Sequence, residues 1–357
     1  MNVAGPKILI VSDIHVGALK SRLDLFIQFL TKISIGKFGK QLQALIILGD
    51  FIDLCISTPK KLLEDKETNQ IFKLLLLIKK KIKIIFCPGN HEIPITSNLL
   101  TGSYDEKFKR RKSKFLRKFK KSIIGKIFSQ NNVCQYVILK KFKGIDTLLL
   151  YDSQDQILDH PINKFKINGI NLVSGYSCLM MHGYQYDSDI YRFFTGQIWK
   201  SLISYHNIEV KEAFNYFWNE IIKGKRKVKP VTLEDMKLEL SKLKNISTDE
   251  VELLFTNLNS FEFNMVKLNM RILKRWERSR EYSYYLNGIK EFLEEAECDL
   301  SEINYIIYGH SHIKGISNET LNDQKVEIIN DGAWQHSNPS YIEILAEGRI
   351  NLKSVNS

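Results

Sequence analysis

Residues 7–15 read KILIVSDIH, an apolar run that ends in two polar residues, Asp13 and His15. The same pattern recurs four times along the chain: ALIILGD at 44–50, KIIFCPGNH at 83–91, CLMMHG at 178–183 and INYIIYGHSH at 303–312. Short apolar runs bounded by turn residues are typical of buried strands. Because helical patterns separate the first three runs, the sequence predicts an α/β fold.

Two helical patterns connect these first runs. From Arg22 to Ile33 the apolar residues repeat at helical spacing, and Ser21 with Asp24 predicts a capping box at the start of that helix. A second helical pattern covers residues 61–80. Further strand-like runs follow near residues 133–139, 147–151, 170–181, 326–330 and 341–345.

Polar residues at the ends of the apolar runs make a set of candidate metal ligands. In an α/β sheet the carboxyl ends of the strands lie along one edge, so side chains placed just after them converge there. A set of oxygen and nitrogen ligands without thiolates favours Mn, Fe, Zn, Co or Ni over calcium. Seven candidates are too many for one tetrahedral site, so the sequence predicts two metal ions if these residues converge: Asp13, His15, Asp50, Asn90, His182, His310 and His312.

Taken in order, the five blocks resemble the motifs of the calcineurin-like metallophosphoesterase superfamily, which read D-x-H, G-D-x-x-D, G-N-H-E/D, a lone H and G-H-x-H. The matching residues are Asp13 to His15, Gly49 to Asp53, Gly89 to Glu92, His182 and Gly309 to His312. The resemblance implies a four-layer α-β-β-α sandwich with a dinuclear metal centre. It also implies a metal-dependent enzyme that hydrolyses a phosphate ester or pyrophosphate bond with a hydroxide shared by the two metals.

The resemblance assigns a role to each matching residue. It places Asp13, His15 and His312 on one metal, and Asn90, His182 and His310 on the other, with Asp50 as the bridge between them. His91 would bind the phosphate and protonate the leaving oxygen, and Asp53 would orient His91. Manganese is the expected metal, with Fe, Zn, Ni or Co as alternatives, and the residues that bind the rest of the substrate are unassigned.

Strand signals stop near residue 184 and resume near residue 302, and helical patterns fill the interval. This change predicts a catalytic domain made of residues 1–183 and 302–357, with residues 184–301 inserted as a helical cap. The insertion, together with H-G-x-x-x-D at His182 to Asp187, is similar to bacterial UDP-2,3-diacylglucosamine hydrolases. Tyr184 departs from that group, since those enzymes usually have Asp at this position.

Charge is concentrated in one segment. The chain of 357 residues has a net charge of +12, and residues 105–126 hold 11 Lys and Arg against Asp105 and Glu106. Phenylalanines at helical spacing make this segment a candidate amphipathic helix. Three interpretations remain open: a solvated surface helix, a site for an anionic membrane surface, or a nucleic-acid site.

Other phosphoesterase classes remain as alternatives. The basic charge keeps a metal-dependent nuclease or phosphodiesterase acting on nucleic acid as the second hypothesis. A protein phosphatase or a non-catalytic binding scaffold comes third. Leu54 and Cys55 replace the Arg and Gly that follow the second Asp in Ser/Thr protein phosphatases, which argues against that class.

The sequence also bears on location and on thiol chemistry. It has neither an apolar run near the roughly 18 residues of a membrane-spanning helix nor a signal-peptide pattern at its start, so we expect a cytoplasmic protein, peripheral to a membrane if the basic helix binds lipid. The five cysteines lack Cys-x-x-Cys spacing, which argues against a disulfide framework and a zinc ribbon.

Overall fold

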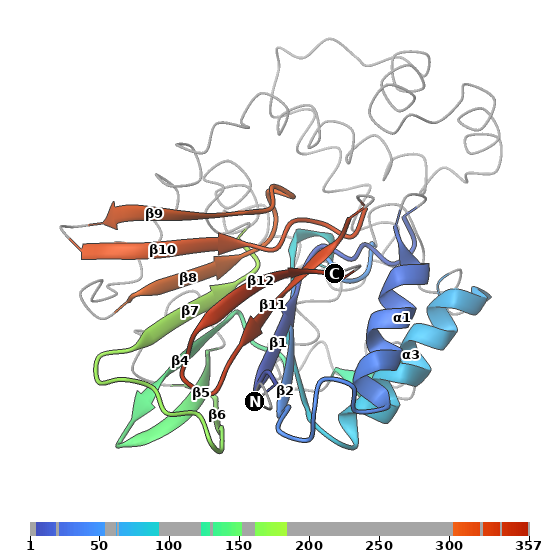
Figure 1. Ribbon diagram of the computed structural model, residues 1–357. Helices are drawn as coiled ribbons and strands as arrows, with labels where there is room; N and C mark the ends of the chain where they lie inside the picture. Colours follow the sequence, from blue (N-terminus) through green and yellow to red (C-terminus); the bar gives the residue numbers. More distant parts are fainter. Residues whose placement is uncertain are drawn as a thin grey trace, which may run out of the picture.

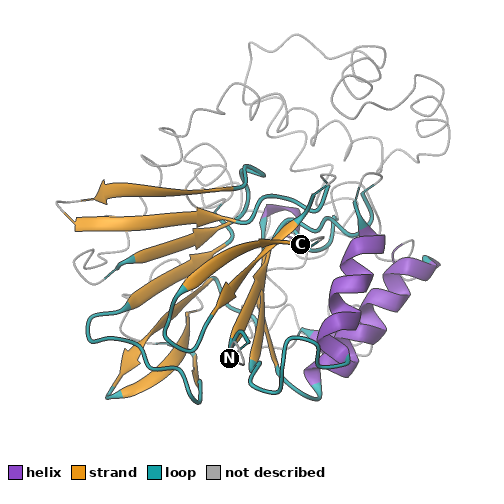
Figure 2. Ribbon diagram, viewed as in Figure 1, coloured by secondary structure: helices purple, strands orange, loops and turns teal. Residues whose placement is uncertain are grey.

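The computed structural model describes residues 5–18, 21–53, 62, 64–92, 123–128, 131–151, 161–183, 303–321, 324–335 and 338–355. Two sheets face each other in this part of the chain, and helices lie beside one of them (Figures 1 and 2). The expected cap at 184–301 and nearly all of the basic segment 105–126 lie outside the described residues. The domain boundaries therefore stay a prediction.

The first sheet contains the N-terminal apolar runs. Its order is β12-β11-β1-β2-β3, with β1, β2 and β3 parallel and β11 antiparallel to β1. Ile8 of β1 pairs with Ala44 of β2, which in turn pairs with Lys83 of β3, so the three strands end at nearly the same level. The strands span Ile8–Val11 (β1), Ala44–Leu48 (β2), Lys83–Cys87 (β3), Ser340–Ile344 (β11) and Ile350–Ser354 (β12).

The second sheet has seven strands in the order β6-β5-β4-β7-β8-β10-β9. Strands β7, β8 and β10 are parallel to one another, whereas the remaining neighbours are antiparallel. The strands span Tyr136–Phe142 (β4), Ile145–Tyr151 (β5), Asn163–Lys166 (β6), Ser177–Met181 (β7), Tyr305–Tyr308 (β8), Gly315–Leu321 (β9) and Gln324–Asn330 (β10).

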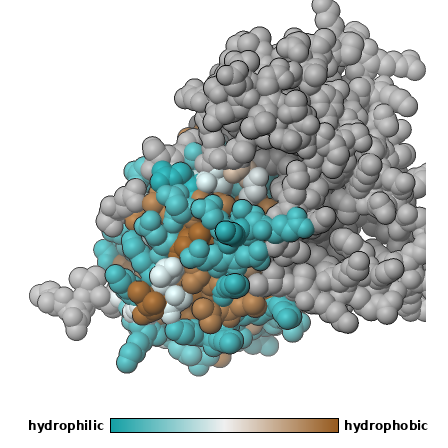
Figure 3. Space-filling model, turned by 90° about the vertical axis from the view of Figure 1, so that its right-hand side faces the viewer, coloured by the Kyte–Doolittle hydropathy of each residue, from teal (hydrophilic) through white to brown (hydrophobic). Residues whose placement is uncertain are grey.

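Helices cover the outer face of the five-stranded sheet, and Figure 3 turns this side toward the viewer. They are α1 (Leu23–Ser34), α3 (Lys66–Lys79) and the short α6 (Ile123–Ile127). Asp65 caps α3 by accepting a hydrogen bond from the Thr68 amide at 2.7 Å. The capping box predicted for α1 is wrong, because Arg22 is the N-cap and makes no side-chain cap bond.

Ser21 has a different task. Its hydroxyl donates to the carbonyl oxygens of Ile14 and His15, the latter at 2.9 Å, and so fixes the loop that follows β1. Asp24 pairs with the Arg22 guanidinium at 2.8 Å on the surface. Neither of the two residues that resembled a capping box therefore caps the helix: Ser21 holds a neighbouring loop and Asp24 forms a surface ion pair.

Alternation along the strands divides the core into layers. In β1, Ile8 and Ile10 face the second sheet, whereas Leu9 and Val11 face the helices. A third apolar cluster, which includes Ile138, covers the outer face of the second sheet. These layers confirm the predicted α/β metallophosphoesterase-type sandwich, in which two mixed sheets pack face to face. Within the described residues, no helix is long and apolar enough to cross a membrane.

Candidate metal centre

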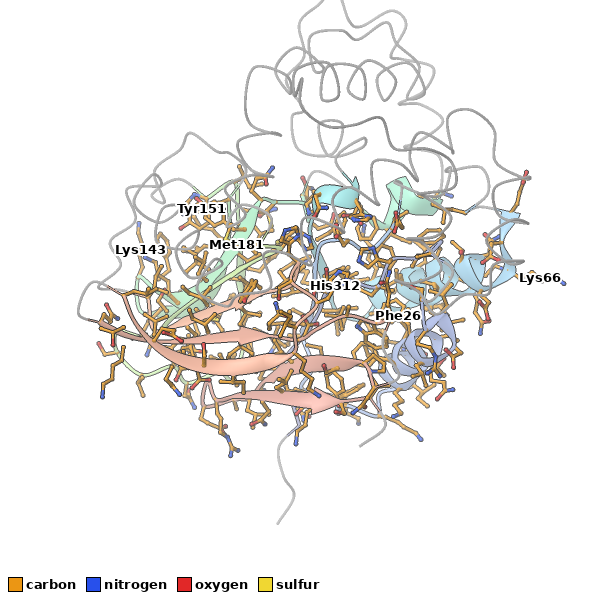
Figure 4. All side chains as sticks on the ribbon, turned by 90° about the horizontal axis from the view of Figure 1, so that it is seen from above. Phe26, Lys66, Lys143, Tyr151, Met181 and His312 are labelled. Atoms are coloured by element: carbon orange, nitrogen blue, oxygen red, sulfur yellow. The ribbon has the colours of Figure 1, made fainter. Side chains whose placement is uncertain are left out.

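The predicted ligands follow the carboxyl ends of five strands that share one edge of the structure. Loops gather at this edge above both sheets in Figure 2, and Figure 4 looks onto it from above with His312 near its middle. The strands are β1, β2 and β3 in the first sheet, and β7 and β8 in the second. Each sheet therefore contributes residues to a common cluster.

The backbone at this edge is strained. Six described residues other than glycine have φ between 46° and 63°, a region that disfavours side chains with a Cβ. One of them, Lys143, belongs to the β4–β5 turn, and the other five are predicted ligands: Asp13, His15, Asp50, His310 and His312. Such residues cost about 1–3 kcal/mol each and concentrate at functional sites. The remaining structure therefore holds these side chains in place against an unfavourable local backbone conformation.

The first group of ligand atoms joins Asp13, His15, Asp50 and His312. His312 Nε2 lies 3.1 Å from His15 Nε2 and 3.2 Å from Asp13 Oδ1. Two ligands that are each about 2.1 Å from a common ion lie about 3.0 to 3.4 Å apart, so these separations suit a shared cation. His312 is the most exposed member, with 16% of its side chain accessible, whereas the others are buried.

The protonation of His15 supports this arrangement. Its Nδ1 lies 3.2 Å from Asp53 Oδ2, so Nδ1 carries the hydrogen and Nε2 presents a lone pair toward Asp13 and His312. Burial is the main influence on this imidazole and lowers the pKa of His15 below its usual value. A neutral imidazole held in one tautomer is the form that binds a metal ion.

The second group joins Asp50, His182 and His310. His182 Nδ1 lies 2.8 Å from the Leu48 carbonyl oxygen, so Nδ1 carries the hydrogen there and Nε2 faces the other way. That Nε2 lies 3.1 Å from Asn90 Oδ1 and 3.3 Å from Asp50 Oδ2. Three electron-rich atoms facing one another need a proton or a cation between them. Although burial lowers the pKa of His182, the Asp50 carboxylate outweighs it and raises that pKa to about 9.

Asp50 is common to both groups. Its Oδ1 accepts a hydrogen bond from the His91 amide at 2.9 Å, which fixes the carboxylate plane. Its Oδ2 is buried, accepts no hydrogen bond of normal geometry, and lies 3.8 Å from His15 Nε2 and 3.3 Å from His182 Nε2. A buried carboxylate oxygen in this situation costs free energy unless a cation neutralises it. The residues present therefore fit a pair of cations that share Asp50.

Asp53 contacts two imidazoles, one more than the sequence indicated. Its Oδ1 lies 2.9 Å from His91 Nδ1, and its Oδ2 lies 3.2 Å from His15 Nδ1. Burial favours the protonated carboxyl, but His91 and His15 reverse that effect and hold the pKa of Asp53 well below its usual range. The carboxylate is thus ionised and orients one predicted ligand together with the predicted general acid.

Glu92 is a site residue whose role the sequence did not reveal. It is buried, and its Oε2 accepts hydrogen bonds from the amides of Asp50 at 2.9 Å and Gly89 at 2.8 Å. Its Oε1 accepts from the Ile52 amide at 2.6 Å. Burial and the nearby Asp50 carboxylate raise the pKa of Glu92, while the amide donors oppose that rise. One carboxylate thereby ties together the loops after β2 and β3.

We expect Glu92→Gln to lower the free energy of unfolding by about 2 kcal/mol, because one oxygen becomes an NH₂ group and leaves at least one buried amide without an acceptor. Urea denaturation of the metal-free protein measures this loss. The matched control is Glu347→Gln at an exposed side chain paired with Arg349, which should change stability by less than about 0.5 kcal/mol. Equal stability of the two variants would contradict the role given to Glu92.

Asp331 is the second residue that the sequence did not reveal. It accepts hydrogen bonds from the Ser12 amide at 2.8 Å and the Ser12 hydroxyl at 2.6 Å, and that hydroxyl also contacts the Asp13 carboxylate. A signal was present, since Asp331 follows an apolar strand as Asp13 and Asp50 do. Asn330 donates to the Gly309 carbonyl at 2.6 Å and holds the loop of His310. The end of β10 therefore supports ligands from β1 and β8.

Two glycines of the motifs lie so close to neighbouring side chains that no larger residue fits. A Cβ on Gly309 would collide with the Asp13 carboxylate and the Ser12 hydroxyl. A Cβ on Gly49, whose φ is +72°, would meet the His182 ring at 2.5 Å. Both positions thus require glycine because a predicted ligand occupies the space of a side chain.

A known protein family matches most of the sequence. The profile of the family described as calcineurin-like phosphoesterase matches residues 6–314. A search of curated protein sequences finds no match. Among solved structures, a dimetal phosphatase from Danio rerio is 12% identical, with a TM-score of 0.38 and coverage of 98% of this chain and 96% of that one.

Two further structures are similar at the same low level. The protein TT1561 of Thermus thermophilus is 8% identical, with a TM-score of 0.33 and coverage of 98% of this chain and 99% of that one. GAP50, described as the anchor in the inner membrane complex of Plasmodium, is 10% identical, with a TM-score of 0.36 and coverage of 99% and 84%. Likeness of this degree assigns no substrate and no partner.

Proposed function

The chain belongs to the calcineurin-like phosphoesterase family, and from this premise we propose that it is a dinuclear metal-dependent hydrolase of a phosphate ester or pyrophosphate bond. One observation carries the proposal: the buried Oδ2 of Asp50, which accepts no hydrogen bond from the described residues, lies between imidazole nitrogens of both ligand groups. Asp13, His15 and His312 would hold one ion, and Asn90, His182 and His310 the other. When bound, two such ions neutralise phosphoryl charge and make water acidic enough to attack at neutral pH.

The protein's own groups supply orientation and a proton. Asp53 holds the Nδ1 sides of His15 and His91, so the Nε2 atom of each ring points toward the Asp50 carboxylate, at 3.8 Å and 3.7 Å. In this position His91, paired with a carboxylate, can carry the proton that the leaving oxygen needs. Manganese is the metal we would supply first, because the mixed oxygen and nitrogen ligand set suits it as well as Fe, Zn, Ni or Co.

Hydrolysis of two chromogenic esters in the presence of Mn²⁺ tests the proposal. We expect turnover of p-nitrophenyl phosphate, bis-p-nitrophenyl phosphate or both, removed by a chelator and restored by the metal. The ratio of the two rates separates a monoesterase from a diesterase. Metal-independent rates, or no turnover of these esters or of a nucleoside diphosphate sugar, would contradict the proposal and leave the binding scaffold as the better hypothesis.

The second candidate is a nuclease, which the net charge of +12 favours. It predicts that the diester is the better of the two chromogenic substrates. It also predicts that a single-stranded oligonucleotide is cleaved with a rate that falls steeply as salt is added. A monoester preference together with an intact oligonucleotide would exclude it.

A further inference from the structure

The end of α1 and the C-terminal half of α3, on the side away from the metal centre, form a distinct surface. Helix α1 connects the parallel strands β1 and β2, and α3 precedes β3, so both helices run against the strands and end at the edge away from the ligands. Lys81 Nζ donates to the Ser34 carbonyl oxygen at 2.6 Å and joins the two helix ends. We call this surface the lysine end and define it by Ile35, Lys37, Lys73, Leu77, Lys80 and Lys81.

The charge of the lysine end is unbalanced. Residues 31–43 contain three lysines and residues 71–83 contain five, and neither stretch contains Asp, Glu or Arg. The ammonium group of Lys79 donates hydrogen bonds to carbonyl oxygens at the end of α6, and that of Lys81 donates to a carbonyl oxygen at the end of α1. Lys37, Lys73 and Lys80 are exposed and form no ion pair with a described acidic residue. The surface therefore offers cationic groups for an external anion.

Apolar side chains lie among these lysines. Ile35 is 62% exposed and Leu77 is 49% exposed, so both offer apolar surface to the solvent. A shallow groove of about 460 Å³ lies along the C-terminal half of α3 beside Leu77, and it is lined by Lys73, Leu76, Leu77, Lys79 and Lys80. Apolar side chains surrounded by hydrophilic ones are visible on this side of the molecule in Figure 3.

We propose that the lysine end binds the surface of a bilayer that contains anionic phospholipids. Lysine side chains reach phosphate headgroups while their aliphatic stems lie on apolar surface, and Ile35 and Leu77 can enter the boundary with the acyl chains. Nucleic acid suits this surface less well. The lysine end contains no arginine and no fully exposed aromatic ring for stacking on bases. Binding to nucleic-acid phosphates would also not explain why Ile35 and Leu77 are exposed there.

A neighbouring element extends the same surface. Helix α6 packs against α3, and Lys79 Nζ donates to the carbonyl oxygens of Lys126 and Ile127 at 2.7 Å. Lys126 is exposed and is the last residue of the basic segment 105–126. The described end of the most basic segment of the chain therefore adjoins the lysine end, and membrane affinity rises with the number of clustered lysines.

This geometry sets the orientation of the enzyme on a membrane. The ligand groups lie at the carboxyl ends of the strands, and the lysine end lies at their amino ends. A molecule bound through the lysine end would turn its metal edge away from the bilayer. If the proposed hydrolase function holds, the substrate then arrives from the aqueous side and is not a lipid embedded in the same membrane.

Co-sedimentation of the full chain with vesicles tests the binding surface without using activity. We expect binding to phosphatidylserine-containing vesicles and little binding to pure phosphatidylcholine. Lys73→Gln with Lys80→Gln should weaken it roughly 30-fold. The matched control, Lys141→Gln with Lys166→Gln, removes equal charge from exposed positions on β4 and β6 and should weaken it less than about threefold. Leu77→Ser should remove the apolar part of the contact. The vesicle binding that remains would then be electrostatic, and added salt should abolish it.

A second readout locates the contact in the unaltered protein. Anionic vesicles should protect Lys73 and Lys80 from chemical acetylation and leave Lys141 and Lys166 reactive. Unchanged vesicle binding by the Lys73 and Lys80 variant, or an equal loss in the control variant, would overturn the proposal. So would an oligonucleotide that protects these lysines when vesicles do not. All variants should hydrolyse the chromogenic substrate like the wild type, which shows that they are folded.

Discussion

Asp50→Asn should lower metal-dependent phosphoester hydrolysis by about a thousandfold or more while the protein stays folded. The substituted amide can keep its oxygen toward the His91 amide, the donor that now lies 2.9 Å from Asp50 Oδ1. Its NH₂ group then occupies the position of Oδ2, between His15 and His182, where it cannot bind a cation. Loss of a shared ligand removes several kcal/mol of charge stabilisation in the transition state, which corresponds to at least about a thousandfold in rate.

Metal content and kinetics together identify the cause. Asp50→Asn should bind less than the full complement of two metal ions, and kcat should fall with kcat/KM, because the shared ligand acts on the transition state. Asp24→Asn is the matched control, since Asp24 pairs only with the exposed Arg22 in the described structure and should keep full activity. Full activity in Asp50→Asn with both ions bound would remove Asp50 from the centre of the site.

How far the fold follows from the sequence depends on burial. The strands recognised in advance, such as β2 (ALIIL) and β7 (SCLMM), are buried at every position and read as continuous apolar runs. Strands β6, β9 and β12 gave no such signal, and each lies at the edge of its sheet. Their residues are half exposed, so β9 reads GISNETL and resembles a loop. Only pairing with a neighbour reveals these edge strands.

The candidate site follows the same logic. Asp13, Asp50 and His182 could be proposed because each follows a buried strand within two residues, and parallel strand ends share an edge. Asp331 also follows a strand, but neither it nor Glu92 could be given a role, because both accept hydrogen bonds from backbone amides or hydroxyls of other strands and loops. Contacts of this kind depend on how separate loops meet, which no local pattern encodes. The second contact of Asp53, to His15, escaped prediction for the same reason.

His91→Ala should slow hydrolysis by about 10²- to 10⁴-fold, and the size of the loss should depend on the leaving group. A general acid matters most when the departing oxygen is strongly basic. Phenyl phosphate should therefore suffer more than p-nitrophenyl phosphate, whose leaving group departs without a proton. His91 Nδ1 is held by Asp53 at 2.9 Å, which leaves Nε2 to carry the transferred proton. Equal losses for the two esters would show that His91 binds phosphate without protonating the leaving oxygen.

Asp53→Asn separates the two tasks of that carboxylate. Asparagine has one acceptor oxygen, so it can serve the Nδ1–H group of His15 or of His91 but not both. We expect metal affinity to fall about 10- to 100-fold through His15, an effect that His91→Ala does not produce. We expect the variant that combines Asp53→Asn with His91→Ala to show the same difference between phenyl phosphate and p-nitrophenyl phosphate as His91→Ala alone. The reason is that Asp53 influences proton transfer only through His91. A further change in that dependence would mean that Asp53 acts on the leaving group by another route.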